Sequence, residues 1–501
     1  MTQNLAIKET RALHQHEPLL WEKEQADASG TDWQVPTNFQ NRTGLSEREN
    51  IGLPQIKEPE VMRHFVRLSS WNYSIDNGFF PLGSCTMKHN PRVNEKLARL
   101  AGFANIHPLQ PVETVQGALG VMHELQTWIA ELTGLPSVCL TPSAGAHGEL
   151  AGIMTIRRAH DLNGQSQRKV ILVPDSAHGT NPATAVMCGY TTRTIDTKET
   201  GRVSVDAFKE ALTKTSEDGS DIAGMMVTNP NTCGLFETDI MPIVDLLHDA
   251  GGYFYCDGAN FNALVGKIRP GDFGVDVMHL NLHKTFSTPH GGGGPGSGPI
   301  CVAECLAPYI PRPLVIKEND QYRLEEDGER ETSLGRLKGF QGQFGMFVRA
   351  LSYMLSHGND GLKQVSEDAV LSANYILSQL KNDYHVPFEG FCMHECLFTD
   401  KKQKENSVTT MDVAKTLVEH GMHPMTVYFP LVVQGAMLIE PTETESKENL
   451  DRFITVMKKI AEDTNVGDTD KFHQYPISAP RRRLDEVGAA RNPKLRWKNA
   501  P

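Results

Sequence analysis

Residues 278–285 read Met-His-Leu-Asn-Leu-His-Lys-Thr. The apolar run predicts a short buried strand from Met278 to Leu282, which would carry Lys284 at its carboxyl end. A lone lysine at the end of a strand is usually a solvated surface group. This one is followed by the polar residues 287–290 and by the glycine-rich run 291–296. Such a run inside a compact domain is typical of backbone that packs closely against a ligand or another subunit.

A second apolar run lies upstream and delivers a carboxylate in the same way. Tyr253 to Cys256 predicts a strand, and Asp257-Gly258-Ala259 follows it directly. Lys284 comes 27 residues after Asp257 (284 minus 257), a spacing that fits one crossover between neighbouring parallel strands. Ligands of open α/β sheets bind at the carboxyl edge. An aspartate there could equally cap the next element, so this motif alone leaves both interpretations open.

The surrounding sequence predicts an α/β fold. Between about 134 and 304, short β-branched or aromatic runs alternate with amphipathic stretches, as expected for a mainly parallel sheet wrapped by helices. We predict strands at 170–173, 225–228, 253–256, 278–282 and 300–303, and helices at 148–159, 240–250, 340–357 and 361–380, with the charged stretch 318–330 as an exposed connection. We expect four parts: an N-terminal arm of helical and loop segments (1–133), a large domain (134–335), a small α+β domain (336–466) and a basic tail (467–501).

A strand-end aspartate followed by a strand-end lysine matches the needs of pyridoxal 5'-phosphate. The carboxylate of Asp257 would keep the pyridine nitrogen protonated, and the amine of Lys284 would form a Schiff base with the aldehyde. A nucleotide-binding P-loop is the rival interpretation of the glycines. It is disfavoured because no Gly-Lys-Ser/Thr follows them.

The cofactor also needs a phosphate site, and residues 141–149 supply a candidate directly before a predicted helix. The small residues Ser143, Ala144, Gly145 and Ala146 would let backbone N–H groups at the helix start face an anion, with the Ser143 hydroxyl as a further donor. An ordinary helix cap is an equally good interpretation of this segment taken alone.

Two more polar turns follow predicted strands. His178, in the turn 175–182, could stack on the cofactor ring while Ala259 presses on its other face, although a turn histidine bonded to local backbone is also reasonable. Thr232, in the turn 228–234, would lie near the phenolic oxygen of the cofactor. Four strand ends would then converge on one site.

Composition excludes several other classes. The chain has 501 residues and a formal charge of -12, which disfavours a general affinity for nucleic acid. No apolar run approaches the roughly 20 residues that a membrane helix needs, and the N-terminal segment has no signal-peptide pattern. Nine cysteines form no CxxC pair. We expect a soluble cytoplasmic protein without a metal. The segment 481–501 runs against the overall charge, with seven basic and two acidic residues, hence +5.

Together these residues give the chain a resemblance to a known family. It resembles the P-protein of the glycine cleavage system, the decarboxylating glycine dehydrogenase, and specifically the catalytic second subunit of its split form. The motifs that carry the resemblance are SAGAHGE (143–149), SAHGTNPA (176–183), DGANFNA (257–263), RPGDFGVDVMHLNLHKTF (269–286) and PHGGGGPGSGP (289–299). Similarity also covers PLGSCTMK (81–88), IHPLQP (106–111), EPTETES (440–446) and RLDEVGAARNP (483–493), so it spans nearly the whole chain.

The resemblance implies an aminotransferase-like fold (fold type I) and a reaction. Such enzymes decarboxylate glycine and pass the aminomethyl group to the lipoyl arm of the H-protein, and the split form works with a sister subunit in an α2β2 heterotetramer. Carried over, Lys284 binds pyridoxal phosphate covalently, Asp257 pairs with the ring nitrogen, and His178 and Ala259 sandwich the ring. Residues Ser143 to Ala146 then meet the phosphate, and Thr232 and His283 complete the site.

Two other functions remain as alternatives. The same lysine and aspartate could serve another amino-acid decarboxylase or a lyase of this fold, and a non-catalytic scaffold subunit is a third hypothesis, which Lys284 in its full setting opposes. The sequence leaves the anchor of the glycine carboxylate and the proton donor open. His147, Glu149 and His394 are candidates, with packing or capping roles equally consistent for each.

Overall fold

The computed structural model describes residues 16–25, 28, 42–46, 52–197, 199–291 and 296–496. Its centre is a seven-stranded sheet with strand order β1-β7-β6-β5-β4-β2-β3. The strands are β1 (Ser137–Cys139), β2 (Arg168–Pro174), β3 (Thr191–Ile195), β4 (Asp221–Thr228), β5 (Tyr253–Gly258), β6 (Val277–Leu280) and β7 (Ile300–Val302). Strands β2 to β6 pair in parallel, whereas β7 runs antiparallel to β6 and β1. The predicted α/β class with a mainly parallel sheet is confirmed.

Helices cover both faces of this sheet. Successive residues along each strand point to opposite faces, so each strand contributes side chains to two cores. Val170 and Leu172 of β2 belong to one core, and Ile171 and Val173 belong to the other. The first core is closed by α4 (Gln116–Thr133), α7 (Val205–Glu217) and α8 (Ile240–Asp249). The second is closed by α5 (Gly145–Leu162), α6 (Thr180–Met187) and the 3-10 helix η5 (Glu304–Tyr309).

The predicted strands lie where the sequence places them, with differences at their ends. Strand β6 stops at Leu280, and Leu282, which we predict as strand, begins the short helix α9 (Leu282–Thr285). The charged stretch 318–330 is not a simple connection, since a hairpin of β8 (Val315–Glu318) and β9 (Gln321–Leu324) reaches into it. Three further 3-10 turns are η2 (Val112–Thr114), η3 (Phe261–Ala263) and η4 (Pro270–Phe273).

Helix α10 (Phe344–Leu380) joins the large sheet to a second, smaller core. Its first half contributes Phe347 to the first core, and its second half contributes Ile376 to the smaller one. It bends at Gly358, whose φ of 62° and ψ of −171° are not helical, so the two predicted helices 340–357 and 361–380 are its two parts. The start is later than predicted because Gly342 has a φ of 114°.

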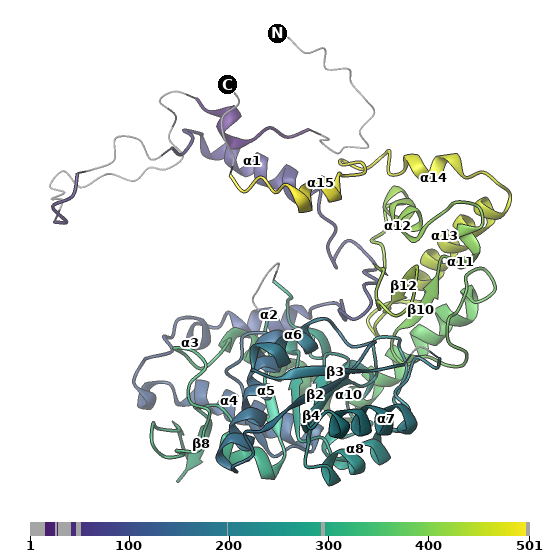
Figure 1. Cartoon of the computed structure of the whole chain (residues 1–501). Coiled ribbons are helices and arrows are strands. Elements are labelled where there is room, and N and C mark those ends of the chain that lie inside the picture. The colour runs from purple at the N-terminus through teal and green to yellow at the C-terminus, as the bar shows by residue number, and fades with distance from the viewer. Residues whose placement is uncertain are drawn as a thin grey trace.

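The smaller core lies under a three-stranded antiparallel sheet of order β10-β12-β11. Its elements are β10 (Cys396–Thr399), α11 (Lys401–Lys404), α12 (Thr410–Glu419), β11 (Thr426–Val427), β12 (Ala436–Ile439), α13 (Lys447–Asn465) and α14 (Asp470–Gln474). In Figure 1 these green and yellow elements stand beside the teal sheet domain. The predicted small α+β unit is therefore present.

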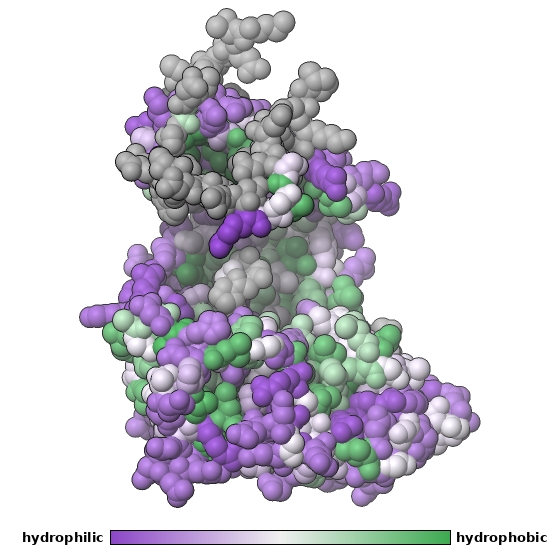
Figure 2. Space-filling view, turned by 90° about the vertical axis from the view of Figure 1, so that its left-hand side faces the viewer, coloured by the Kyte–Doolittle hydropathy of each residue, from purple (hydrophilic) through white to green (hydrophobic). Residues whose placement is uncertain are grey.

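The segments before α4 and after α14 spread over and beyond these cores. They contain η1 (Leu20–Lys23), α1 (Glu58–Ser69), α2 (Arg92–Ala98), α3 (Ala101–Ala104) and α15 (Glu486–Arg491). Figure 1 shows α1 and α15 away from both sheets. The segments next to these two helices meet, since the guanidinium of Arg481 lies 4.5 Å from the centre of the Trp71 ring. In the face that Figure 2 presents, hydrophilic residues alternate with separate hydrophobic patches.

The division of the chain at residues 134, 336 and 467 remains a prediction. Helix α4 lies before the first of these boundaries, yet it packs into the first core through Leu125 and Ile129. The first boundary therefore does not coincide with an edge of that core. No helix in the described ranges is both long enough and apolar enough to cross a membrane.

Candidate active site

A cavity of about 280 Å³ opens at the carboxyl edge of the parallel strands. Seven of the residues predicted from the sequence line it: Gly145, Ala146, His178, Thr232, Asp257, Ala259 and Lys284. They come from the end of β5 and from the segments that follow β1, β2, β4, β5 and β6, so the edge of the sheet brings together residues that are up to 139 positions apart (284 minus 145).

Asp257 is buried near the end of β5, opposite His279 of β6. One carboxylate oxygen accepts the N–H of Ala259 at 2.9 Å, and the other accepts the side-chain amide of Asn181 at 3.2 Å. Burial by itself raises the pKa of this carboxyl group, but His279, the Ala259 N–H and Lys284 lower the pKa by more, so it stays below its ordinary value. Asp257 is thus held as an anion at the bottom of the cavity.

Lys284 reaches the same cavity from α9, three residues after Asn281, the residue at which the turn begins. Its ammonium donates a hydrogen bond to the carbonyl oxygen of Ser84 at 2.7 Å. The turn packs directly on the start of α5, where a Cβ on Gly145 would lie 2.6 Å from Oδ1 of Asn281. Glycine is therefore required at 145 for the lysine turn and the helix start to approach each other.

The start of α5 is an uncapped helix end facing the cavity. Its N-cap residue is Ala144, which has no side-chain acceptor, and Gly145 and Ala146 line the cavity. Free N–H groups and the positive end of the helix dipole make such a place suited to an anion. Ser143 lies just behind this point: its hydroxyl accepts from Nζ of Lys338 at 2.7 Å, and its N–H donates to Nδ1 of His147 at 3.2 Å. Neither Ser143 nor Ala144 lines the cavity.

His178 is hydrogen-bonded to its neighbour Thr180. Nδ1 of His178 lies 3.2 Å from the backbone nitrogen of Thr180. The Thr180 hydroxyl lies 2.8 Å from the same nitrogen and donates to Glu149 at 2.9 Å. The His178 ring contacts Phe429 edge-on, with ring centres 5.8 Å apart.

Glu149 is a buried carboxyl group on the cavity wall. Burial, followed by repulsion from Asp257, raises its pKa to about 7. Oε2 accepts from Thr180, whereas Oε1 is buried without a hydrogen-bond partner among the described residues. Glu149 therefore changes protonation near neutral pH beside a carboxylate that stays ionised.

The last two predicted residues are placed differently. The hydroxyl of Thr232 donates to the carbonyl of Ser176 at the cavity wall, which leaves its oxygen as an acceptor there. His283 does not line the cavity and turns instead toward His290, with ring centres 5.1 Å apart, and accepts the N–H of Ser297 at 3.3 Å. Burial, then the nearby His290 and Lys284, lower the pKa of His283 to about 3, so the ring is neutral.

The cavity fits a phosphate-bearing pyridine aldehyde. An amine and an anionic carboxylate stand at its wall, and an uncapped helix end offers N–H groups to a phosphate. Three further lining residues, Thr228, Asn260 and Asn281, each carry a buried side-chain oxygen without a hydrogen-bond partner among the described residues. Since buried polar groups are normally paired, this set indicates a polar ligand.

Relatives of the whole chain carry one common name. A protein of Caulobacter vibrioides named probable glycine dehydrogenase (decarboxylating) subunit 2 is 56% identical over 97% of this chain and 93% of its own length. The chain belongs to the glycine dehydrogenase (decarboxylating) subunit 2 family. A Staphylococcus epidermidis member is 47% identical over 96% of this chain and 95% of its own length. Residues 365–477 also match the family model for the glycine dehydrogenase C-terminal domain.

Solved structures place this glycine dehydrogenase family member in fold type I. A glycine decarboxylase (P-protein) of the glycine cleavage system, in inhibitor-bound form, superposes with a TM-score of 0.69 at 22% identity and covers 84% of this chain and 93% of its own. The Oryza sativa TDC solved with PLP and tryptamine gives a TM-score of 0.64 at 13% identity, covering 86% and 92%. The expected fold is therefore confirmed.

Several lining residues of this glycine dehydrogenase family member are absent from the sequence prediction of the site. Gly83, Ser84 and Cys85 come from the segment before α2, and Thr426 and Phe429 come from the small domain. Their positions along the chain give no sign that they meet Lys284. The motif at 81–88 does signal importance, but only through the family resemblance.

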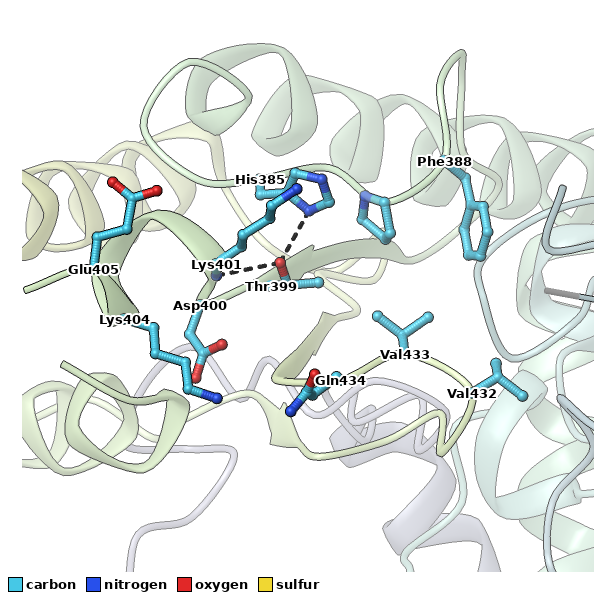
Figure 3. A pocket seen from close by; sticks show the side chains of 11 residues that line it. His385, Phe388, Thr399, Asp400, Lys401, Lys404, Glu405, Val432, Val433 and Gln434 are labelled. Carbon is cyan, nitrogen blue, oxygen red and sulfur yellow. Dashed lines mark hydrogen bonds between the residues drawn. The ribbon is translucent and has the colours of Figure 1, made fainter. Parts of the chain in front are cut away.

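A larger hollow of about 650 Å³ lies elsewhere, in the small domain, and Figure 3 shows it. Lys401 and Lys404 stand there beside Asp400 and Glu405, and His385 lies 3.0 Å from the Thr399 hydroxyl. None of the predicted site residues lines it, and its lysines stand among carboxylates. We therefore assign the chemistry of this glycine dehydrogenase family member to the smaller cavity.

Proposed function

We propose that this chain decarboxylates glycine with pyridoxal phosphate bound covalently to Lys284, and transfers the aminomethyl group to the lipoyl arm of the H-protein. The observation that carries the proposal is the pair of Lys284 and Asp257 at neighbouring strand ends of one cavity, in a chain whose relatives are named glycine dehydrogenase subunit 2.

The residues of the chain divide the work of holding the cofactor. The N–H groups at the start of α5, around Gly145 and Ala146, bind the phosphate through the positive end of the helix. Asp257 holds the proton on the ring nitrogen, because its carboxylate is buried and anionic. His178 and Ala259 face the two sides of the ring, and Thr232 offers its oxygen to the phenolic group. Ser143, just before the start of α5, accepts a hydrogen bond from Lys338 through its hydroxyl.

Pyridoxal phosphate supplies a protonated ring that takes up the electron pair released when the bond between the α-carbon of glycine and its carboxylate breaks. The His178 ring lies at the cavity wall, where it can orient an anionic oxygen of the substrate by hydrogen bonding.

The partner proteins belong to the same proposal. Relatives of this chain are named subunit 2, so we infer a sister subunit that corresponds to subunit 1, with an α2β2 heterotetramer as the assembly. A cytoplasmic location stays a prediction from the sequence.

The test is carbon dioxide release from carboxyl-labelled glycine by the purified chain, its sister subunit and lipoylated H-protein. We expect release that requires glycine and the lipoyl group. Decarboxylation of larger amino acids, with no dependence on H-protein, would support the alternative of another decarboxylase. A chain that binds no pyridoxal phosphate at all would support the scaffold alternative.

A further inference from the structure

A loop of the N-terminal region, residues 83–86, passes between Lys284 and the small domain. Its first residue is tied to the small sheet: the N–H of Gly83 donates to Leu438 at 3.2 Å, and the hydroxyl of Thr426 donates to the Gly83 carbonyl at 2.9 Å. The next carbonyl, that of Ser84, accepts the ammonium of Lys284 at 2.7 Å. Within the described ranges, loop 83–86 therefore provides the one hydrogen-bond acceptor of the lysine amine.

The backbone of loop 83–86 is strained at two residues. Ser84 has a φ of 61° and Thr86 has a φ of 44°, a left-handed conformation that residues with a Cβ rarely adopt and that is particularly unusual for a β-branched threonine. Such a conformation persists only where the surroundings hold it.

Two buried carboxyl groups hold those same two residues. Glu395, just before β10, accepts the N–H of Ser84 at 2.7 Å, and Glu440, just after β12, accepts the N–H of Thr86 at 2.9 Å. Both side chains are fully buried. One side-chain nitrogen of His394 and one oxygen from each of the two glutamates all lie within 4.8 Å of one another. We call Glu395 and Glu440 the carboxyl pair.

The charges around the carboxyl pair favour the neutral form of Glu395. Burial, then repulsion from Glu440, hold the pKa of Glu395 well above its ordinary value. Burial also lowers the pKa of His394, so this ring supplies no cation. The nearby Lys88 is already neutralised by Glu443 at 2.7 Å. Lys284 is the remaining neighbouring cation that lowers the pKa of Glu395.

The other titratable neighbours are thiols. Burial raises the pKa values of Cys85, Cys392 and Cys396, so these groups are neutral and add no charge. Burial and repulsion from Glu440 both favour the neutral form of Glu395, so this carboxyl group can hold the loop without adding a buried negative charge.

We propose that Glu395 and Glu440, by holding Ser84 and Thr86 of loop 83–86 in their left-handed conformation, position the amine of Lys284. This inference rests on the proposed function in one respect. A lysine that carries the cofactor has to release it to the amino group of a substrate and take it back afterwards. The Ser84 carbonyl is the place where the released amine is held, and the carboxyl pair is what keeps that carbonyl in position.

The first experiment compares Glu395→Ala with Glu395→Gln in cofactor-loaded protein. The displacement of Lys284 from the cofactor by methoxyamine is followed by visible absorbance, a reaction that needs no glycine turnover. We expect Glu395→Ala to slow displacement about tenfold, because the released amine loses its fixed acceptor. Glu395→Gln should restore the rate, because an amide oxygen still accepts the Ser84 N–H.

The second experiment measures charge. The pH midpoint of the visible band should be near that of the wild type in Glu395→Gln, since the amide replaces a carboxyl group that burial keeps neutral. In the double variant Glu395→Gln/Glu440→Gln the midpoint should fall by about one unit, because neither buried carboxyl group is left to stabilise a positive nitrogen on Lys284. This measurement of the pH midpoint tests the inference even if Glu395→Ala fails to fold.

Glu237→Gln is the matched control, because Glu237 is also buried and accepts a backbone N–H, from Val203 at 2.8 Å, but does not line the cavity. The inference is overturned if Glu395→Gln is as slow as a folded Glu395→Ala, or if the double variant keeps the wild-type midpoint. Should the chain prove to act on a substrate other than glycine, both outcomes would still stand.

Discussion

Lys284 owes its reach into the cavity to a single change of direction in the chain. Strand β6 ends at Leu280, and the turn at Asn281 starts α9, so the side chain leaves the sheet edge toward Ser84 rather than toward solvent. If the strand continued to Leu282, as the apolar run predicts, Lys284 would lie further along the strand direction rather than within α9.

We predict that Lys284→Ala abolishes turnover and the visible band of the bound cofactor. A methyl group cannot form the covalent link, and no other amine lines the cavity within the described ranges. Absorbance spectra and glycine-dependent carbon dioxide release are the measurements. Full decarboxylation by this variant would remove Lys284 from its proposed role.

Asp257→Asn should keep the fold and lose most of the catalysis. The amide retains the size of the carboxylate but cannot favour the protonated ring nitrogen. The loss of a charge-assisted hydrogen bond costs about 1.5–3 kcal/mol, more than tenfold in rate if it is felt only in the transition state. Turnover is compared at saturating cofactor, and an unchanged rate would show that Asp257 does not pair with the ring.

Glu149 predicts a pH dependence of stability in the cofactor-free protein. Its pKa is raised from 4.5 to about 7, so the folded state binds its proton more tightly than the unfolded state does. The stabilisation is fully present below pH 4.5 and is lost as the pH rises to 7, by up to about 3 kcal/mol. Glu149→Gln should flatten the unfolding free energy over this window.

Glu237 is the control for that measurement, because its pKa is raised to about 7 chiefly by burial, away from the cavity. Glu237→Gln should remove a similar part of the slope without changing cofactor binding. A Glu149→Gln variant with the wild-type slope would contradict the assignment.

Among single residues, the sequence identifies those that follow strands and misses those that reach the site from afar. Asp257 and Lys284 are visible because each ends an apolar run at a spacing that fits one crossover. The hydrogen bonds that link His178 to Thr180 and Thr180 to Glu149 are not visible in the sequence, because side-chain pairing of this kind has no periodic signal. Ser143 is predicted as a phosphate donor from its position. In the structure its hydroxyl accepts from Lys338 and keeps its own O–H to donate, and the phosphate role stays a prediction.

Among the elements, α10 carries the sharpest backbone requirement outside the cavity. Gly358 adopts a φ of 62° and a ψ of −171°, a region that essentially only glycine occupies, and nothing lies within 4 Å of an added Cβ. Gly358→Ala therefore tests backbone strain alone, and we expect it to lower the free energy of unfolding by about 1–3 kcal/mol.

Gly117→Ala, in α4, is the matched control, because its added Cβ also meets nothing within 4 Å and its φ is ordinary. That change should stabilise the protein by up to about 1 kcal/mol, since alanine is the better helix former. Urea unfolding measures both. Equal stability of wild type and Gly358→Ala would show that the bend in α10 is not imposed by backbone geometry.

Long buried elements are predictable and exposed ones are not. Strands β2, β4 and β5 are continuous apolar runs between two helical layers, which gives a strong signal. Strand β3 reads Thr-Thr-Arg-Thr-Ile at the edge of the sheet and has only Ile195 buried, so it lacks the apolar run that marks the central strands. The hairpin of β8 and β9 is missed for the same reason.

At the scale of the whole molecule, the cavity needs parts that are far apart in sequence. Its wall includes Cys85 from the N-terminal region, Lys284 from the large domain and Phe429 from the small domain. No local sequence pattern indicates that these distant residues are in contact. The sequence therefore predicts only the part of the site that lies at the edge of the sheet.

We predict that the chain is inactive or feeble alone and requires a sister subunit as well as the lipoylated H-protein. Hydrophobic side chains on α1, among them Met62, Phe65 and Val66, are more than half exposed, as expected of a surface that another chain covers. The glycine run 291–296, which we also regard as a subunit contact, lies partly outside the described residues, as does the end of the basic tail. Activity and light scattering of mixtures are the measurements, and full activity with H-protein alone would refute the prediction.

The hydrogen bonds from Ser84 to Glu395 and from Thr86 to Glu440 span 311 and 354 residues of sequence. On a ribosome that adds about 5–20 residues per second, loop 83–86 therefore waits about 20–70 s for the carboxyl groups that hold it. A nascent chain that has completed every strand of the large sheet, and already carries Lys284, still has no fixed acceptor for the lysine amine. Correct seating of the cofactor then belongs to the last moments of synthesis, and a chain cut short before Glu440 would display its lysine without being able to position it.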